Sequence, residues 1–183
     1  MFKKLAIILT GFAILFTFAG IATAKTIAKV TPKASPTPTP VPVVNSFELF
    51  WPMVAGKTMQ SKVYFLKIWE EDLRGFLIFG SAQKADNDIF LSTKRMLEAE
   101  VLIKGNVPDL ANKTLDSAAT DLDKANSALN DAKNSSDIDQ GTKDEINNRV
   151  SNLKLFTNSL MSQYPTYKDK LQSILDKLNS IVI

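Results

Sequence analysis

The 183 residues of the chain include no cysteine and no histidine. The side-chain groups that remain for chemistry are therefore carboxylates, amines, guanidinium groups and hydroxyls. Without cysteine there are no disulfides, no thiolate metal ligands and no thiol nucleophile. Without histidine there is no Ser-His-Asp triad, no imidazole zinc site and no Glu-x-x-His di-iron motif. We therefore expect no catalytic residue, no cofactor and no metal site, and we expect that the protein is not an enzyme.

The segment Gly56-Lys57-Thr58 resembles the end of a phosphate-binding loop. The full motif also needs an earlier glycine, and this chain has Trp51 at that position, followed by Pro52. Tryptophan and proline do not suit a flexible cradle of backbone amides. The spacing therefore argues against a nucleotide site.

The acidic segment 137–141 has some of the character of a calcium loop. Such a loop places oxygen ligands at alternate positions and a bidentate glutamate at its last position. Counted from Asp137, one of the alternate positions is Gly141 and the last position is Asn148. We therefore expect a solvated turn here, within a polar loop that runs from Asn134 to Gly141.

Carboxylates also occur two residues apart, in the pairs Glu98/Glu100 and Asp121/Asp123. Residues at this spacing point to different faces of a helix, so neither pair can act together as acid and base. We expect both pairs to lie on solvated, charged faces. The expected ion-pair partners are Lys94 for Glu98 and Lys104 for Glu100.

Residues 1–24 have the layout of a secretory signal peptide. A short cationic start is followed by the uncharged apolar run Leu5–Ile21 and then by small residues. The alternative is an uncleaved signal anchor. In both cases the rest of the chain is expected outside the cytosol. The cleavage site is expected at Ala22, Ala24 and Lys25.

Residues 25–46 form the expected linker. Between Thr31 and Pro42 proline alternates with small residues, which favours an extended polyproline II spacer. Its reach is at most about 70 Å. The alternation lacks the arginine that flanks ligands of proline-binding modules, so a plain spacer is favoured.

The positive net charge belongs to the leader and the linker. Residues 1–46 hold five of the 22 basic residues and no acidic residue, so residues 47–183 hold 17 basic against 19 acidic residues. A nearly neutral domain lacks the basic surface that nucleic-acid binding needs. We therefore expect no nucleic-acid partner.

Residues 47–183 show helical periodicity and no sustained alternation of the kind that strands need. The expected fold is all-α, a four- to five-helix bundle preceded by the signal or anchor helix and the proline-rich linker. Helices are predicted from Ser61 to about Gly80, from Ala82 to Lys104, from Pro108 onward, from Thr142 to about Tyr164, and from Tyr167 to Ile181. The first has an apolar face that includes Leu66, Trp69, Leu73, Phe76 and Leu77.

Two features of these helices are specific. The Thr142-Lys143-Asp144-Glu145 segment predicts a capping box that begins the fourth helix. The third helix has an unbroken seam in which alanine alternates with leucine at heptad spacing, which allows a neighbouring helix to approach closely. The seam is either internal or a site of self-association. It consists of Ala111, Leu115, Ala118, Leu122, Ala125, Leu129 and Ala132.

Two further apolar stretches, Phe47–Val54 and Gly75–Gly80, do not fit a single inward face. The favoured interpretation is that they pack together and cover the bundle. The sharper hypothesis is an exposed patch that meets a partner or a lipid surface. The candidate patch residues are Phe76, Leu77, Ile78 and Phe79.

The stretch from residue 51 to about 114 resembles a known family. The segments Trp51–Met59, Val63–Lys67, Lys84-Ala85 and Lys94–Glu100 are similar to the bacterial domain of unknown function 5667. The resemblance implies an export signal or anchor, a low-complexity spacer and a helical domain. It implies no activity, so no catalytic residue follows from it.

The hypothesis that fits these observations best is an exported, envelope- or surface-associated helical module that works by binding. Its partner would be another protein or a second copy, with membrane contact through the N-terminal segment where that is uncleaved. Two alternatives stay open. One is an envelope hydrolase that uses carboxylates from different helices, and the other is a bundle that senses a lipid or small ligand.

Overall fold

A computed structural model describes residues 43–135 and 138–183. Within these residues all regular secondary structure is helical, as the periodicity predicts. The expected leader, with Ala22, Ala24 and Lys25, lies outside the described residues, as do most of the linker and Asp137. The elements are α1 (Ser46–Phe50), α2 (Tyr64–Phe76), α3 (Ser81–Lys104), α4 (Pro108–Ser135), α5 (Gln140–Gln163), the short 3₁₀ helix η1 (Pro165–Tyr167) and α6 (Lys168–Ser180).

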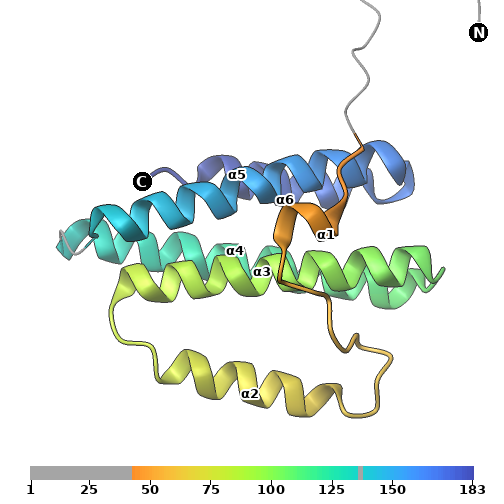
Figure 1. Ribbon diagram of the computed structural model, residues 1–183, viewed down its shortest axis with the longest axis horizontal. Helices are drawn as coiled ribbons and strands as arrows, with labels where there is room; N and C mark the ends of the chain where they lie inside the picture. Colours follow the sequence, from red (N-terminus) through yellow and green to blue (C-terminus); the bar gives the residue numbers. More distant parts are fainter. Residues whose placement is uncertain (1–42, 136–137) are drawn as a thin grey trace, which may run out of the picture. The chain divides into compact units, whose positions relative to one another are not determined.

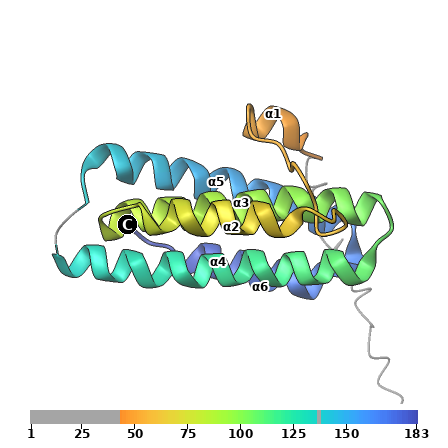
Figure 2. The ribbon, with the colours of Figure 1, turned by 90° about the horizontal axis from the view of Figure 1, so that it is seen from below.

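Helices α3 and α4 pack side by side along most of their lengths (Figures 1 and 2). The small residues of the seam allow a close approach, and Ser92 Oγ of α3 donates a hydrogen bond to the Ala118 carbonyl of α4 at 3.0 Å. Every residue of the seam from Ala111 to Ala132 is at most 2% exposed. The seam is therefore internal, which leaves no free surface there for a second copy.

Helices α5 and α6 form a second layer that closes the bundle, with α5 against α3 and α6 against α4 (Figure 1). The core between the layers is aliphatic apart from Phe156 and Phe50, whose rings meet edge to face at 5.4 Å. Its largest fully buried side chains include Ile89, Met96, Leu122, Leu129, Leu153, Phe156, Leu171 and Ile174.

The short helix α1 covers one side of this core. Phe50 is buried, and Leu49 and Met53 pack against the core, so part of the Phe47–Val54 stretch covers the bundle as expected. Phe47 and Trp51 remain more than half exposed and stack edge to face on each other at 4.8 Å.

Several helix ends differ from the predicted ones. Helix α5 begins at Gln140 because Asp139 accepts a hydrogen bond from the Thr142 amide at 2.9 Å, so the predicted capping box is not formed. Glu145 instead pairs with Arg149 one turn later. The loop after α4 is shorter than expected, and the last helix starts only at Lys168, after η1.

Among the described residues, the buried core residues lie between Phe50 and Ile181, with Leu49 and Ile183 packed against them. Thr39–Ile183 is one compact unit. A fragment with these bounds therefore contains a complete core, and we expect it to fold without the preceding segment. Within the described ranges no helix is both long and apolar enough to cross a membrane.

Candidate functional site

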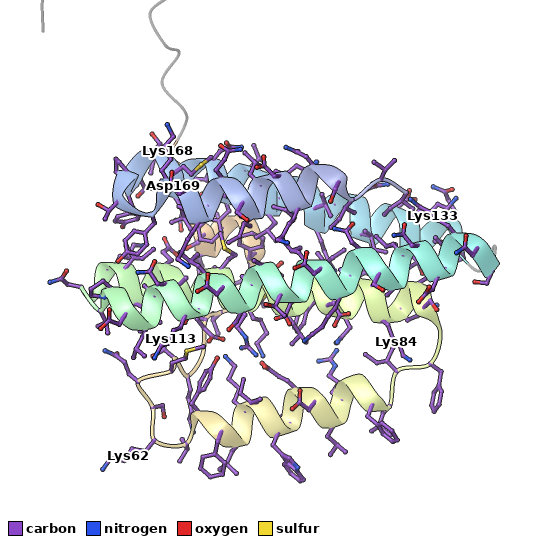
Figure 3. All side chains as sticks on the ribbon, turned by 180° about the vertical axis from the view of Figure 1, so that it is seen from behind. Lys62, Lys84, Lys113, Lys133, Lys168 and Asp169 are labelled. Carbon is purple, nitrogen blue, oxygen red and sulfur yellow. The ribbon has the colours of Figure 1, made fainter. Side chains whose placement is uncertain are left out.

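Helix α2 does not belong to the closely packed helix pairs of the bundle. It runs alongside α3 as a separate outer layer (Figures 1 and 2). Side chains from both helices fill the space between them (Figure 3). These side chains are mostly charged, which is unusual because a bundle normally receives the apolar face of an amphipathic helix.

The first half of the contact is centred on Glu98 of α3, whose side chain has no exposed surface. Its carboxylate accepts hydrogen bonds from Lys67 and Tyr64 of α2 and from Arg95 of α3, the last two at 3.1 and 3.0 Å. Burial raises the pKa of Tyr64, so its hydroxyl stays protonated and donates. Burial also lowers the pKa of Lys67, against the opposing effect of Glu98.

The second half of the contact is centred on Glu71 of α2. Lys94 donates to it at 2.8 Å, and Arg95 also pairs with it, so Arg95 joins the two glutamates. Burial would raise the pKa of Glu71, but the hydrogen bonds from Lys94 and Arg95 outweigh it and hold that pKa below its usual range. We call Tyr64, Lys67, Glu71, Lys94, Arg95 and Glu98 the α2–α3 charge network.

The charge network corrects the expected surroundings of two α3 residues. Glu98 is fully buried and does not lie on a solvated face, and Lys94 pairs with Glu71 instead of Glu98. Glu100 does pair with Lys104, at 2.7 Å, as predicted, but its own side chain is buried and does not lie on a solvated face. Asp121 is also largely buried, and its partner is Lys124 at 3.1 Å.

Because the polar side of α2 faces α3, its apolar side faces solvent. Trp69 is 66% exposed, Phe76 is 80% exposed and Phe79, just beyond the helix, is 85% exposed. Figure 3 shows that side chains on the outer side of α2 point away from the bundle. We define the α2 apolar face as Phe65, Leu66, Trp69, Leu73, Phe76, Leu77 and Phe79.

The structure therefore exposes most of the candidate patch. Phe76, Leu77 and Phe79 are exposed, and Ile78 is half-buried. This differs from the favoured interpretation that segment 75–80 packs with residues 47–54 over the core. The patch is also larger than predicted, since it extends along the whole of α2.

A cleft of about 550 Å³ lies between the α1 segment, α3 and α5. Its walls include Trp51, Phe90 and Asn152, so it is partly aromatic and partly polar. Arg149 lies at its edge, 5.4 Å from the centre of the Phe90 ring. Arg149 Nε also lies 2.8 Å from Asp86 Oδ1, as an ion pair without well-aligned hydrogen-bond geometry.

A smaller hollow of about 320 Å³, between α2, α3 and α4, is acidic. Asp121 lines it, and burial raises the pKa of this carboxyl against the opposing effect of Lys124. Beside it, burial and the charge of Asp121 raise the pKa of Asp88 to about 6. The hollow thus holds carboxylates from different helices, but Glu71 and Asp121 are each neutralised by a cation.

The segment with a resemblance to a phosphate-binding loop lies well before α2. Lys57 is exposed, and its carbonyl accepts a hydrogen bond from Lys67 at 3.2 Å. Since α2 begins only at Tyr64, Gly56–Thr58 is not followed directly by the helix N-terminus on which a phosphate-binding loop depends.

The charge network was not expected from the sequence. Its signal was present: Lys67 and Glu71 are four residues apart, as are Lys94 and Glu98, so each helix has a charged stripe. A charged face of a helix normally lies in solvent. It becomes buried only where it pairs with the charged face of another helix, as the faces of α2 and α3 do here.

A family model matches this chain. The family described as Domain of unknown function (DUF5667) matches residues 58–153, which is more than half of the chain. The match begins seven residues later than the expected resemblance and extends beyond it, through α4 into α5. No curated protein and no solved structure matches this chain significantly. The match includes both helices of the charge network. The chain belongs to the family of the domain of unknown function 5667.

Proposed function

We propose that the protein is an exported, non-catalytic interaction module that binds its partner at the cell envelope with the α2 apolar face. The observation that carries the proposal is the orientation of α2, whose charged side is buried while seven large apolar side chains are between 47% and 85% exposed. Contiguous apolar surface of this kind marks a site of association. Its removal from water would stabilise a complex.

The buried network supports a binding role for this face. A helix held by ion pairs has its apolar residues free, whereas a helix packed by its apolar face would have nothing to offer a partner. Glu71 and Arg95 also hold α2 in one rotation about its axis. The face is thus preorganised, which lowers the entropic cost of binding.

The proposed export is supported by the sequence of residues 1–24. A cationic start, an apolar run and Ala22-Thr23-Ala24 are the parts that an export signal needs. Mass measurement of the native product tests it. We expect a product that starts at Lys25, or an intact chain in the membrane fraction. An intact chain free in the cytosol would contradict export.

The binding role is tested with the fragment Thr39–Ile183, fluorescently labelled and titrated onto isolated cell envelopes. We expect saturable binding that unlabelled fragment competes away. The double variant Phe76→Ser/Phe79→Ser should lose at least about tenfold in affinity. Leu155→Ser is the control, because Leu155 is 50% exposed on α5, outside the face. Equal binding by the double variant and the wild type would refute the proposal.

One observation favours the hydrolase alternative, namely the raised pKa values of Asp88 and Asp121 beside the acidic hollow. A carboxylate hydrolase needs one protonated acid and one free carboxylate that face the same hollow. Asp121 is ion-paired with Lys124 and is therefore not a free carboxylate, so this function is the second candidate. If the protein hydrolysed an envelope polymer and Asp88→Asn lost this activity, the hydrolase function would be favoured over the binding function.

The ligand-sensing alternative is favoured by the cleft of about 550 Å³, a size typical of small-molecule sites. The variant Asn152→Leu keeps the approximate volume of the side chain and removes polar groups from the cleft wall. Binding of envelope-derived small molecules that this variant abolishes would support the alternative.

A further inference from the structure

We propose that the α2 apolar face docks on the surface of a lipid bilayer, with α2 lying in the interface and its rings among the headgroups and upper acyl chains. The inference rests on the proposed function and names the partner of the same site. Three properties of the face lead to it: its shape and composition, the charges at its border, and the chain that precedes the domain.

The first property is shape and composition. Helix α2 is the outermost layer on its side of the bundle, so its apolar face is a ridge (Figures 1 and 3). A protein partner needs a matching groove, whereas a lipid surface deforms around a ridge. Tryptophan, phenylalanine and leucine on one face, with charged residues opposite, are typical of helices that lie in a membrane interface.

The second property is charge. The border of the face carries Lys62, at its N-terminal end (Figure 3), together with Glu70 and Asp72, all exposed. Both signs are therefore present. Zwitterionic headgroups also carry both signs, phosphate and ammonium, so they can pair with this border without net repulsion.

The same border argues against a second copy as the occupant. At 100° per residue, Glu70 and Asp72 lie on opposite flanks of a face centred on Trp69 and Leu73. In a parallel pair of α2 helices, Glu70 of one copy would face Asp72 of the other. In an antiparallel pair, each would face its own counterpart. Both arrangements bring like charges together.

The third property is the chain before the domain. The apolar run Leu5–Ile21 has the composition of a membrane-inserted segment, and the 22 residues between it and Val44 can span at most about 70 Å. The described chain starts beside α5, where the Val44 amide donates to Ser159 Oγ at 2.9 Å, and α5 lies on the other side of α3 from α2 (Figure 1). Helix layers are about 10 Å apart, so the linker is long enough to bring α2 to the membrane.

The experiment uses the fragment Thr39–Ile183, which lacks the apolar run. The chain has two tryptophans, so Trp51→Phe leaves Trp69 as the only one. Vesicles of phosphatidylcholine and phosphatidylethanolamine are added. We expect the Trp69 emission to shift to the blue, brominated acyl chains to quench it, and the fragment to sediment with the vesicles.

Matched variants locate the contact. Leu66→Ser and Leu155→Ser remove side chains that are 51% and 50% exposed, on α2 and α5 respectively. The double variant Leu66→Ser/Phe76→Ser should reduce vesicle partitioning by about tenfold or more, whereas Leu155→Ser should change it by less than about twofold.

Three results would overturn the inference. One is the absence of both the blue shift and co-sedimentation. The second is an equal loss in Leu155→Ser. The third is a stable dimer in solution that Leu66→Ser dissociates, since the face would then be covered by a second copy. If envelopes bind the fragment and lipid vesicles do not, the lipid assignment fails and the proposed function stands. If neither binds it, both fail.

Discussion

Lys67 of α2 donates a hydrogen bond to the carboxylate of Glu98 of α3, and the side chain of Glu98 has no exposed surface. This contact joins two helices that otherwise pack poorly against each other. It places a charged pair where a bundle usually places leucines. The orientation of α2, and with it the exposed apolar face, depends on this buried pair and on Arg95 beside it.

The first prediction concerns this pair. Glu98→Gln leaves Lys67 without a carboxylate and Arg95 with Glu71 alone, so we expect a loss of about 3 kcal/mol in the free energy of unfolding. Urea titration of the fragment Thr39–Ile183 measures it. Glu100→Gln is the matched control, because the partner of Glu100 is a largely exposed lysine, and it should cost less than about 1 kcal/mol. Equal losses would show that the network does not hold α2.

The second prediction concerns the exposed face. Phe76→Ser and Phe79→Ser should each change the free energy of unfolding by less than about 0.5 kcal/mol, because neither ring is buried. Leu122→Ala, in the core, should cost about 2–5 kcal/mol. Thermal and urea unfolding measure both. If Phe76→Ser lowered the free energy of unfolding as much as Leu122→Ala does, segment 75–80 would have to be part of the core.

The third prediction concerns the Ala/Leu seam. Ala118→Leu adds volume where α3 and α4 are in contact, since Ser92 Oγ is 3.0 Å from the Ala118 carbonyl. We expect a loss of about 1–3 kcal/mol from overpacking, with no change in the oligomeric state. Ser127→Leu, exposed on the same helix, is the control. Light scattering and urea titration test both parts, and a changed oligomeric state would show that the seam is accessible.

The fourth prediction concerns pH. The pKa of Asp88 is raised to about 6 by burial and by Asp121, so its ionised form is disfavoured in the folded state. The contribution of Asp88 to the free energy of unfolding is therefore fully present below its unfolded pKa, near 4, and is lost as the pH rises through 6. Solvent screening of this half-buried group limits the loss to about 1 kcal/mol.

The variant Asp88→Asn isolates this effect. We expect it to be more stable than the wild type at pH 7.5 and to lose this advantage as the pH falls below 4, because the aspartate then becomes neutral in both states. Asp131→Asn, exposed on α4, is the control and should show no such pH-dependent difference. A destabilised Asp88→Asn at pH 7.5 would mean that the ionised carboxylate stabilises the fold.

Most of the bundle could be predicted from local pattern. Gly105 after Lys104 and Pro108 at the first position of α4 mark helix boundaries by their backbone chemistry, and the structure places them there. The cap of α5 could not be predicted in this way. Asp139 and Thr142 are both good cap residues, and the choice between them depends on where the chain leaves α4.

Some features of the candidate site could likewise be predicted from the sequence, and others could not. The sequence by itself determined that α2 has one apolar and one charged side, since the spacing of Leu66, Trp69 and Leu73 allows nothing else in a helix. It also determined the all-α class and the existence of the Ala/Leu seam, whereas the burial of that seam became clear only from the structure. Only the tertiary structure decided which side of α2 faces the bundle. The reason is that Arg95 and Glu98 of α3 form a charged surface, and a buried charge is stable only where an opposite charge meets it.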